Sequence, residues 1–367
     1  MILFGNLNKE KTNILIAPLN WGLGHAVRDI PLIYNLLKNK FEVIIGGEGQ
    51  SGELLKNEFP ELQYVEIQSF KIKYPKNQFF ILKLLFQIPK IFIGIIGEHK
   101  HLQNIIDKYE IDIIISDNRY GLYSDKIPSV FITHQVFPAL PKSLKIFEKI
   151  IYKSHRKRID KFEKCLIPDF EGKINLSGDL SHKYKFSENY HFIGILSQFE
   201  KDDIETADYK YDIAVIISGP EPQRSIFEEK ITEQILQSGK KAILISGLPE
   251  TSIRKQVENL TIVNHLSRAE MQDVIVNSEI IISRSGYTTI MDLVKLQKKA
   301  VLIPTPGQTE QEYFSDYLKN KTMFVFRKQN NFDLNNAVSE LKTLNPDFKK
   351  NSNLDCNSFI NIIKSLK

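Results

Sequence analysis

The chain has 367 residues, 42% of them hydrophobic and 25% charged, which is enough for two cores of ordinary size. Two cysteines far apart, Cys165 and Cys356, predict neither a disulfide framework nor a cysteine metal cluster, and they indicate a reducing, cytoplasmic setting. The net charge is only +5, but residues 68–108 and 141–164 together carry 16 Lys and Arg against 5 Asp and Glu. This basic excess predicts an anionic surface or substrate beside the first half.

Short apolar stretches alternate with helical patterns from the start of the chain. Residues 1–12 hold no apolar stretch of signal-peptide length, so we expect no export signal. Strands are predicted at 13–19, 41–47, 63–67, 111–116, 129–133 and 164–167, and helices at 26–37, 79–108 and 142–162. This alternation of strands and helices is typical of a parallel sheet.

A polar, charged segment at residues 200–208 has the composition of a linker. Beyond it, strands are predicted at 212–217, 241–245, 261–264, 279–283, 300–303 and 323–326, with helices at 223–238, 268–276, 286–296 and 308–320. We therefore predict an α/β protein with two doubly wound, Rossmann-like domains facing across a cleft. The expected bounds are 1–198 and 199–350, followed by a C-terminal helix within 351–367. Ligands of such sheets bind beyond the carboxyl ends of the strands, so the site is expected in the cleft.

The strand–turn–helix at residues 280–292 is a candidate phosphate site. A helix start directly after a strand presents free backbone amides, here at Ser285, Gly286 and Tyr287, together with the positive end of the helix dipole. About two turns into the helix, Asp292 is placed to reach a sugar hydroxyl beside the phosphate. The alternative is an ordinary capped helix.

A second candidate follows the first predicted strand, at Gly22, Gly24 and His25. The glycines allow a tight turn and a close approach to a ligand, and a histidine near a helix start tends to stay neutral, as a general base requires. The third glycine of the dinucleotide fingerprint is missing. A structural turn with a capping histidine is the alternative.

Further candidates stand at other strand ends. The turn at Ser218 and Gly219 precedes Arg224, which sits in the first helical turn, where it can reach a phosphate, or is a solvated helix residue. The loop and helix start at 304–313 holds amide and carboxylate side chains suited to sugar hydroxyls, although such residues are also common on any surface. His134 ends a strand of the first half, where it can orient an acceptor or serve a structural role.

In this order the pieces resemble the GT-B glycosyltransferases and, more closely, the MurG-like group with a family 28 type C-terminal domain. That group transfers a sugar from a UDP-sugar to a lipid-linked acceptor. The resemblance covers about residues 14–325 and is strongest at residues 283–292 and 304–313. It implies that the second half binds the nucleotide-sugar.

The resemblance also implies roles for single residues. Those facing the donor phosphates would be Ser218, Gly219, Arg224 and the amides of Ser285, Gly286 and Tyr287. Asp292 would hold the ribose, where the family usually has Glu. Gln311 and Glu312 fall where the family has two glutamines on the donor sugar, and Glu312 departs from the N-acetylglucosamine type. His25 and His134 fall on two acceptor-side histidines, of which His25 is the candidate base.

The resulting hypothesis is a glycosyltransferase that uses no cofactor and no metal, because no Asp-x-Asp motif ends a strand of the second half. A nucleotide-sugar 2-epimerase and a non-catalytic nucleotide-sugar-binding protein are the alternatives. Nucleic acid is not an expected partner, since residues 141–164 show little aromatic interleaving.

Membrane contact is a separate question. The apolar stretch at 78–96 is interrupted by Lys83, Pro89 and Lys90, which disfavours a spanning helix. Apolar residues beside lysines suit an anionic bilayer surface, while a buried helix pair with a solvated basic face explains the same pattern. The expected location is the cytoplasm or the inner face of the membrane.

Overall fold

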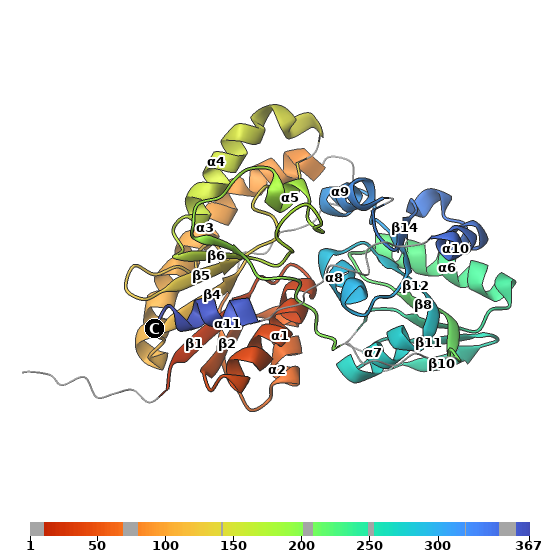
Figure 1. Cartoon of the computed structure of the whole chain (residues 1–367), viewed down its shortest axis with the longest axis horizontal. Helices are drawn as coiled ribbons and strands as arrows, with labels where there is room; N and C mark the ends of the chain where they lie inside the picture. The colour runs from red at the N-terminus through yellow and green to blue at the C-terminus, as the bar shows by residue number, and fades with distance from the viewer. Residues whose placement is uncertain are drawn as a thin grey trace, which may run out of the picture.

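The computed structural model describes residues 11–68, 80–140, 142–200, 208–248, 253–319, 321–344 and 357–367. Two lobes are visible, each built on one twisted sheet with helices on both faces (Figure 1). The predicted fold class, two parallel-sheet α/β domains, is confirmed. Most of the predicted linker, residues 201–207, lies outside the described residues.

The first sheet has seven parallel strands in the order β3-β2-β1-β4-β5-β6-β7. Their residues are mostly apolar and buried, as expected for strands that are covered by helices on both faces. The strands are β1 (Asn13–Pro18), β2 (Glu42–Gly47), β3 (Gln63–Glu66), β4 (Ile113–Asp117), β5 (Ser129–Ile132), β6 (Lys164–Ile167) and β7 (Tyr190–Phe192).

Helices connect most of these strands. They are α1 (Gly24–Lys38), α2 (Gly49–Glu58), α3 (Phe80–Tyr109), α4 (Glu148–Ile159) and the short α5 (Asp179–His182). The helix predicted at 142–162 is divided, because a 3₁₀ segment, η1 (Lys142–Phe147), precedes α4. No helix of the described residues is long and apolar enough to cross a bilayer.

The second sheet repeats the plan in the order β10-β11-β9-β8-β12-β13-β14, with β10 antiparallel at the edge. Its strands are β8 (Tyr211–Ile216), β9 (Ala242–Ile245), β10 (Arg254–Val257), β11 (Leu260–Val263), β12 (Ser278–Arg284), β13 (Ala300–Ile303) and β14 (Phe324–Phe326). Its helices are α6 (Gln223–Ser238), α7 (Arg268–Val276), α8 (Tyr287–Lys295), α9 (Thr309–Leu318) and α10 (Leu334–Thr343), with η2 (Gln329–Asn331) between β14 and α10.

The strand order of each sheet reverses direction at one point, between β1 and β4 in the first and between β8 and β12 in the second. At such a point the two connections leave in opposite directions and open a crevice beyond the carboxyl ends of the strands. The carboxyl ends of both sheets face the other lobe, as shown by the Gly24–Thr288 and His134–Glu310 hydrogen bonds that join loops of the two. The fold therefore brings two crevices together.

The chain returns to the first lobe at its end. Helix α11 (Asn357–Lys364), dark blue in Figure 1, lies in the same lobe as α1. Lys364 Nζ donates to Asn39 Oδ1 at 2.9 Å, and Lys367 lies over the Phe41 ring. Phe359, Ile360 and Ile363 belong to the same buried core as α1 and β2. The amphipathic C-terminal helix expected from the sequence is present and ties the end of the chain to the first sheet.

Replacement of Ile363, which is fully buried, tests this docking. Ile363→Asp places a carboxylate in an apolar contact, and we expect it to lower the free energy of unfolding by about 3 kcal/mol. Urea unfolding followed by circular dichroism measures the change. Asn361→Asp, on the exposed side of α11, serves as control and should change stability little. An equally stable Ile363→Asp variant would contradict the docking.

Candidate functional site

The turn after β1 forms the first-lobe wall of the site. Leu19 N donates to Asp117 O at 2.9 Å, which holds the turn against the end of β4. Gly22 has φ +98°, a conformation that favours glycine, and its carbonyl accepts from Ser51 Oγ at 3.0 Å. Helix α1 then begins at Gly24 with no side-chain cap. The first amides of α1 are thus left without a side-chain partner at this turn.

His25 lies in the first turn of α1 against a buried ion pair. Its Nδ1 is 3.0 Å from Asp117 Oδ1 and 2.9 Å from Arg28 Nη2. Arg28 holds Asp117 through two nitrogens, with Nε donating to Oδ2 at 2.6 Å and Nη2 to Oδ1. Both charged side chains are almost fully buried, whereas the His25 side chain remains 17% exposed. The imidazole is thereby anchored at Nδ1 and leaves Nε2 for a ligand.

The charge of Asp117 follows from these neighbours. Burial alone would raise the pKa of its carboxyl, but Arg28 and His25 outweigh that effect and lower the pKa below its usual range. Asp29, which is fully buried beside this pair, shows the opposite: burial and the charge of Asp117 raise its pKa well above the ordinary value. The pKa values of the two neighbouring carboxyls are thus shifted in opposite directions.

His134 lies deeper in the cleft and contacts both lobes. Its Nδ1 is 3.0 Å from Arg28 Nη1, and its Nε2 is 2.9 Å from Glu310 Oε1 at the start of α9. The ring stacks on Tyr287 with centroids 4.1 Å apart. Burial lowers the pKa of His134 and opposes the effect of Glu310, which raises it. Because both ring nitrogens are engaged, His134 is held in place more firmly than His25.

On the second lobe, α8 begins directly after β12 with Gly286 at its N-cap and no side-chain cap. Ser285 is buried, and its Oγ donates to Gln311 O at 3.3 Å, while Tyr287 donates from its hydroxyl to Pro168 O at 2.9 Å. Thr288 Oγ1 donates to Gly24 O at 3.1 Å. Two uncapped helix starts, those of α1 and α8, therefore meet across the cleft.

The turn at Ser218 and Gly219 is exposed at the end of β8, next to the end of β12. Gly219 has φ +106°, so a side chain there would be strained. Arg224 is only 9% exposed, and its guanidinium donates to Glu221 at 2.7 Å and Glu228 at 2.5 Å. A phosphate contact by Arg224 stays a prediction, and it requires an exchange of these carboxylate partners.

Gln311 and Glu312 fold back on the loop between β13 and α9. Gln311 Oε1 accepts from Thr305 N at 2.8 Å, and Glu312 Oε1 accepts from Gly307 N at 3.0 Å. These contacts shape the loop, and the sugar contacts implied by the resemblance stay predictions. The neighbouring Glu310, which the sequence reasoning passed over, is the residue of this turn that reaches His134.

Asp292 faces the segment that leaves the first lobe. Its carboxylate accepts from Ser197 Oγ at 2.6 Å and from Gln198 Nε2 at 3.5 Å, and it is only 6% exposed. Burial raises the pKa of Asp292 to about 7, and the hydrogen bonds from Ser197 and Gln198 oppose this rise. In this structure Asp292 is hydrogen-bonded to Ser197 and Gln198, in the segment that leads from the first lobe to the second. The ribose contact implied by the resemblance stays a prediction.

The sequence assigned no role to three residues of the site, Arg28, Asp117 and Glu310, although Asp117 begins a suggestive polar cluster after the strand predicted at 111–116. Asp117 had a signal, since it ends the strand that neighbours β1 at the switch point. Arg28 had a weaker one, because it lies three residues after His25 and so on the same face of a helix. Among the described residues no group of three or more His, Cys, Asp or Glu side chains is arranged to hold a metal ion.

Comparison with known proteins gives a family match in the C-terminal half and relatives that are named as glycosyltransferases. Residues 223–366 match the glycosyltransferase family 28 C-terminal domain. An uncharacterised glycosyltransferase of Methanosarcina acetivorans is 25% identical over 312 residues, covering 82% of this chain and 81% of that protein. The UDP-N-acetylglucosamine–N-acetylmuramyl-(pentapeptide) pyrophosphoryl-undecaprenol N-acetylglucosamine transferase of Sulfurihydrogenibium sp. is 23% identical over 178 residues, 46% of this chain and 50% of that protein.

Solved structures share the fold at low identity. The glycotransferase of kitacinnamycin superposes with a TM-score of 0.69 at 14% identity and covers 97% of this chain and 100% of that one. MurG of Acinetobacter baumannii gives a TM-score of 0.58 at 11% identity, over 97% and 99% of the two chains. The spinosyn rhamnosyltransferase SpnG, complexed with thymidine diphosphate, gives 0.60 at 11% identity, over 90% and 92%.

The raised pKa of Asp292, about 7, predicts a pH dependence of stability. A carboxyl whose pKa is higher in the folded than in the unfolded protein favours folding at low pH, and this contribution is lost as pH rises through 7. Asp292→Asn removes it. We expect the variant to gain stability relative to wild type between pH 5 and 8, by about 2.5 kcal/mol.

Urea unfolding at both pH values measures this gain. Asp316→Asn, an exposed carboxyl on α9, is the matched control and should show no such difference. If the free energies of unfolding of wild type and Asp292→Asn change with pH in the same way over this range, the buried carboxyl is not the source of the pH dependence.

Proposed function

Because this chain is a glycosyltransferase of the GT-B fold whose C-terminal half carries a glycosyltransferase family 28 C-terminal domain, we propose that it transfers a sugar from a nucleotide-sugar to an acceptor hydroxyl with His25 as general base. UDP is the expected nucleotide, and no metal ion takes part. The observation that carries the proposal is the position of His25, whose anchored Nδ1 leaves Nε2 beside the facing starts of α1 and α8.

Asp117 prepares His25 for this role. An ionised carboxylate beside Nδ1 favours the tautomer with its proton on Nδ1, which leaves the lone pair on Nε2. Asp117 does not touch the reacting atoms and is a positioning residue. His134, with both ring nitrogens engaged, is assigned to positioning rather than proton transfer.

The reaction proceeds by displacement at the anomeric carbon. The acceptor oxygen forms a bond to this carbon while the bond to the donor diphosphate breaks, and the diphosphate leaves with the electron pair. His25 Nε2 takes the acceptor proton. The uncapped amides of α8, at Ser285, Gly286 and Tyr287, stabilise the departing negative charge in place of a metal ion.

The second lobe supplies the remaining donor contacts in this proposal. Ser218 and Gly219 lie at the switch point beside Ser285, where a diphosphate is expected. Arg224 adds a cation when phosphate displaces Glu221. Asp292 takes the ribose and Gln311 and Glu312 the sugar, as the family resemblance implies.

The names of relatives bear on the donor and the acceptor. The Sulfurihydrogenibium relative is named for a UDP-sugar and an undecaprenol-linked acceptor, whereas SpnG was solved with thymidine diphosphate. We propose UDP and a lipid-linked acceptor for this chain. An epimerase is not proposed, since the cleft carboxylates Asp117 and Glu310 are held by Arg28 and His134 rather than presented to a sugar.

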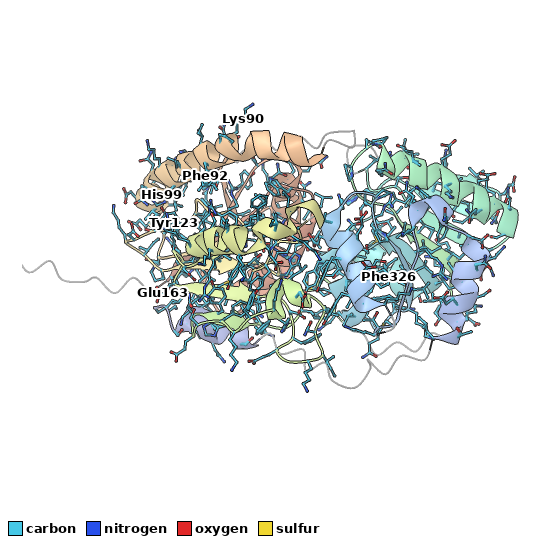
Figure 2. The ribbon with its side chains drawn as sticks, turned by 90° about the horizontal axis from the view of Figure 1, so that it is seen from above. Lys90, Phe92, His99, Tyr123, Glu163 and Phe326 are labelled. Carbon is cyan, nitrogen blue, oxygen red and sulfur yellow. The ribbon has the colours of Figure 1, made fainter. Side chains whose placement is uncertain are left out.

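We propose that the first lobe contacts the cytoplasmic face of a membrane through one of its surfaces. Helices α3 and α4 lie side by side, with Arg158 4.6 Å from the centre of the Phe92 ring, and Figure 2 shows Lys90 on the outer side of α3. Large apolar side chains are exposed on both helices and on η1: Phe92, Ile93, Ile96, Ile146, Phe147 and Ile150. Exposed lysines accompany them at positions 90, 145, 149, 153 and 157. This surface suits peripheral contact with anionic lipid.

Substitution of His25 tests the chemistry. His25→Ala should lower kcat by about 10²- to 10⁴-fold because no general base remains, with donor binding retained. Release of UDP is measured with a panel of UDP-sugars and lipid extract, and thermal shift with UDP-, GDP- and dTDP-sugars reports binding. His101→Ala, exposed on α3, is the matched control. Full activity of His25→Ala removes the proposed base, and absence of nucleotide binding removes the donor assignment.

A pair of substitutions tests the membrane surface. Ile146 and Ile150 are 84% and 68% exposed, and we expect Ile146→Asp with Ile150→Asp to weaken vesicle binding about tenfold or more by loss of apolar insertion. Flotation with vesicles of phosphatidylglycerol and phosphatidylcholine measures it. Ile253→Asp, exposed on the second lobe, is the control. Wild-type protein that stays unbound at low salt refutes peripheral contact.

A further inference from the structure

Glu310 brings a carboxylate of the second lobe into the buried network of the first. It lies at the start of α9, and its Oε1 is 2.9 Å from His134 Nε2 while its Oε2 accepts from Gln135 Nε2. Its side chain is 31% exposed, so it reaches the network from the cleft side. The two partners are 176 residues apart in sequence. The contact therefore joins the two lobes.

His134 is fixed from four directions. Its carbonyl accepts from Ser181 Oγ at 2.6 Å, its ring stacks on Tyr287 with an interplanar angle of 8°, and its two nitrogens meet Arg28 and Glu310. Arg28 can only donate, so His134 Nδ1 must be an acceptor. The ring proton is therefore on Nε2, from which it is donated to Glu310. Arg28 and the Glu310 carboxylate together thus select the tautomer of His134.

Arg28 links the tautomer of His134 to that of His25, because one guanidinium contacts both rings. Its Nη1 donates to His134 Nδ1, and its Nη2 lies within reach of both Asp117 Oδ1 and His25 Nδ1. Two arrangements compete at His25 Nδ1. When Nδ1 donates to Asp117, Nε2 has the lone pair that a base needs; when Arg28 Nη2 donates to Nδ1, the proton is on Nε2 and the ring is no base. The orientation of the Arg28 guanidinium decides between them.

We propose that Glu310 is a positioning residue which, through His134 and Arg28, holds His25 in the tautomer with its lone pair on Nε2. The base is then ready only while the lobes are closed around α9, the helix that also carries the proposed sugar contacts Gln311 and Glu312. The inference rests on the proposed role of His25. The titratable and charged groups that face this chain of contacts are His25, Arg28, Asp29, Asp117, His134 and Glu310.

Kinetics of two Glu310 variants test the proposal. Glu310→Ala removes the acceptor for His134 Nε2, and we expect kcat to fall about 10- to 100-fold with a KM for the donor within about twofold of wild type. Glu310→Gln keeps a carbonyl oxygen for that hydrogen bond and should retain most of kcat. Asp316→Asn, exposed on the same helix, is the control. A raised KM with unchanged kcat overturns the proposal, because it shows a contact to substrate or a lobe latch instead.

The tautomer itself is measured without any substrate. In protein labelled with ¹⁵N in its histidine rings, at about pH 8.5 and so above the ordinary pKa of imidazole, long-range ¹H–¹⁵N spectra distinguish Nδ1–H from Nε2–H. The His25 signals are assigned by their loss in His25→Gln. We expect Nδ1–H in wild type and a shift towards Nε2–H in Glu310→Ala, whose thermal unfolding confirms that it is folded.

If the His25 signals are unchanged in Glu310→Ala, the proposed coupling between Glu310 and the tautomer of His25 is wrong. The spectra separate this inference from the proposed function. A changed tautomer in a protein that transfers no sugar from any nucleotide-sugar tested leaves the coupling standing and removes the transfer activity.

Discussion

The buried ion pair between Arg28 and Asp117 is the interaction on which the site depends. Two charges removed from water stay buried only when each is matched, and loss of one partner of such a pair costs about 3–5 kcal/mol. Here the guanidinium holds both carboxylate oxygens and so fixes the first turn of α1 against the end of β4. His25 is carried on that turn. The position of the proposed base is therefore set by a buried ion pair in which both carboxylate oxygens are bound.

The boundary between the lobes is built like a protein interior. One apolar core runs from the first sheet, through Tyr287 and Met291 of α8, to Phe314 of α9. Polar contacts within it join specific atoms, such as Gly24 O to Thr288 Oγ1. Because apolar packing supplies the attraction and hydrogen bonds fix the register, the starts of α1 and α8 face each other closely. Neither lobe alone contains a complete site.

Much of the fold was predictable from local sequence. Short apolar runs, buried in the sheets, marked nearly all the parallel strands, and most of the helices between them followed from apolar periodicity. Two strands were not predicted, the short β7 and β10. The strand β10 has no apolar signal, because Arg254, Lys255 and Gln256 form an exposed antiparallel edge. Helix α10 was not predicted, although Leu334, Ala337, Val338 and Leu341 follow the apolar spacing of a helix. The contact of α11 with the first lobe had no local signal, since it joins distant parts of the chain.

By itself, the sequence determined the two sheets and the kinds of residue that stand at their carboxyl ends, because backbone propensity and apolar periodicity are local properties. It located His25, His134 and the start of α8, since glycine turns and helix starts are visible in a few residues. Only the tertiary structure decided which of these groups meet. Asp117 reaches His25 across 92 residues because β1 and β4 are neighbours in the sheet. On α9, where each residue is turned by about 100° from the last, packing against the first lobe placed Glu310 on His134.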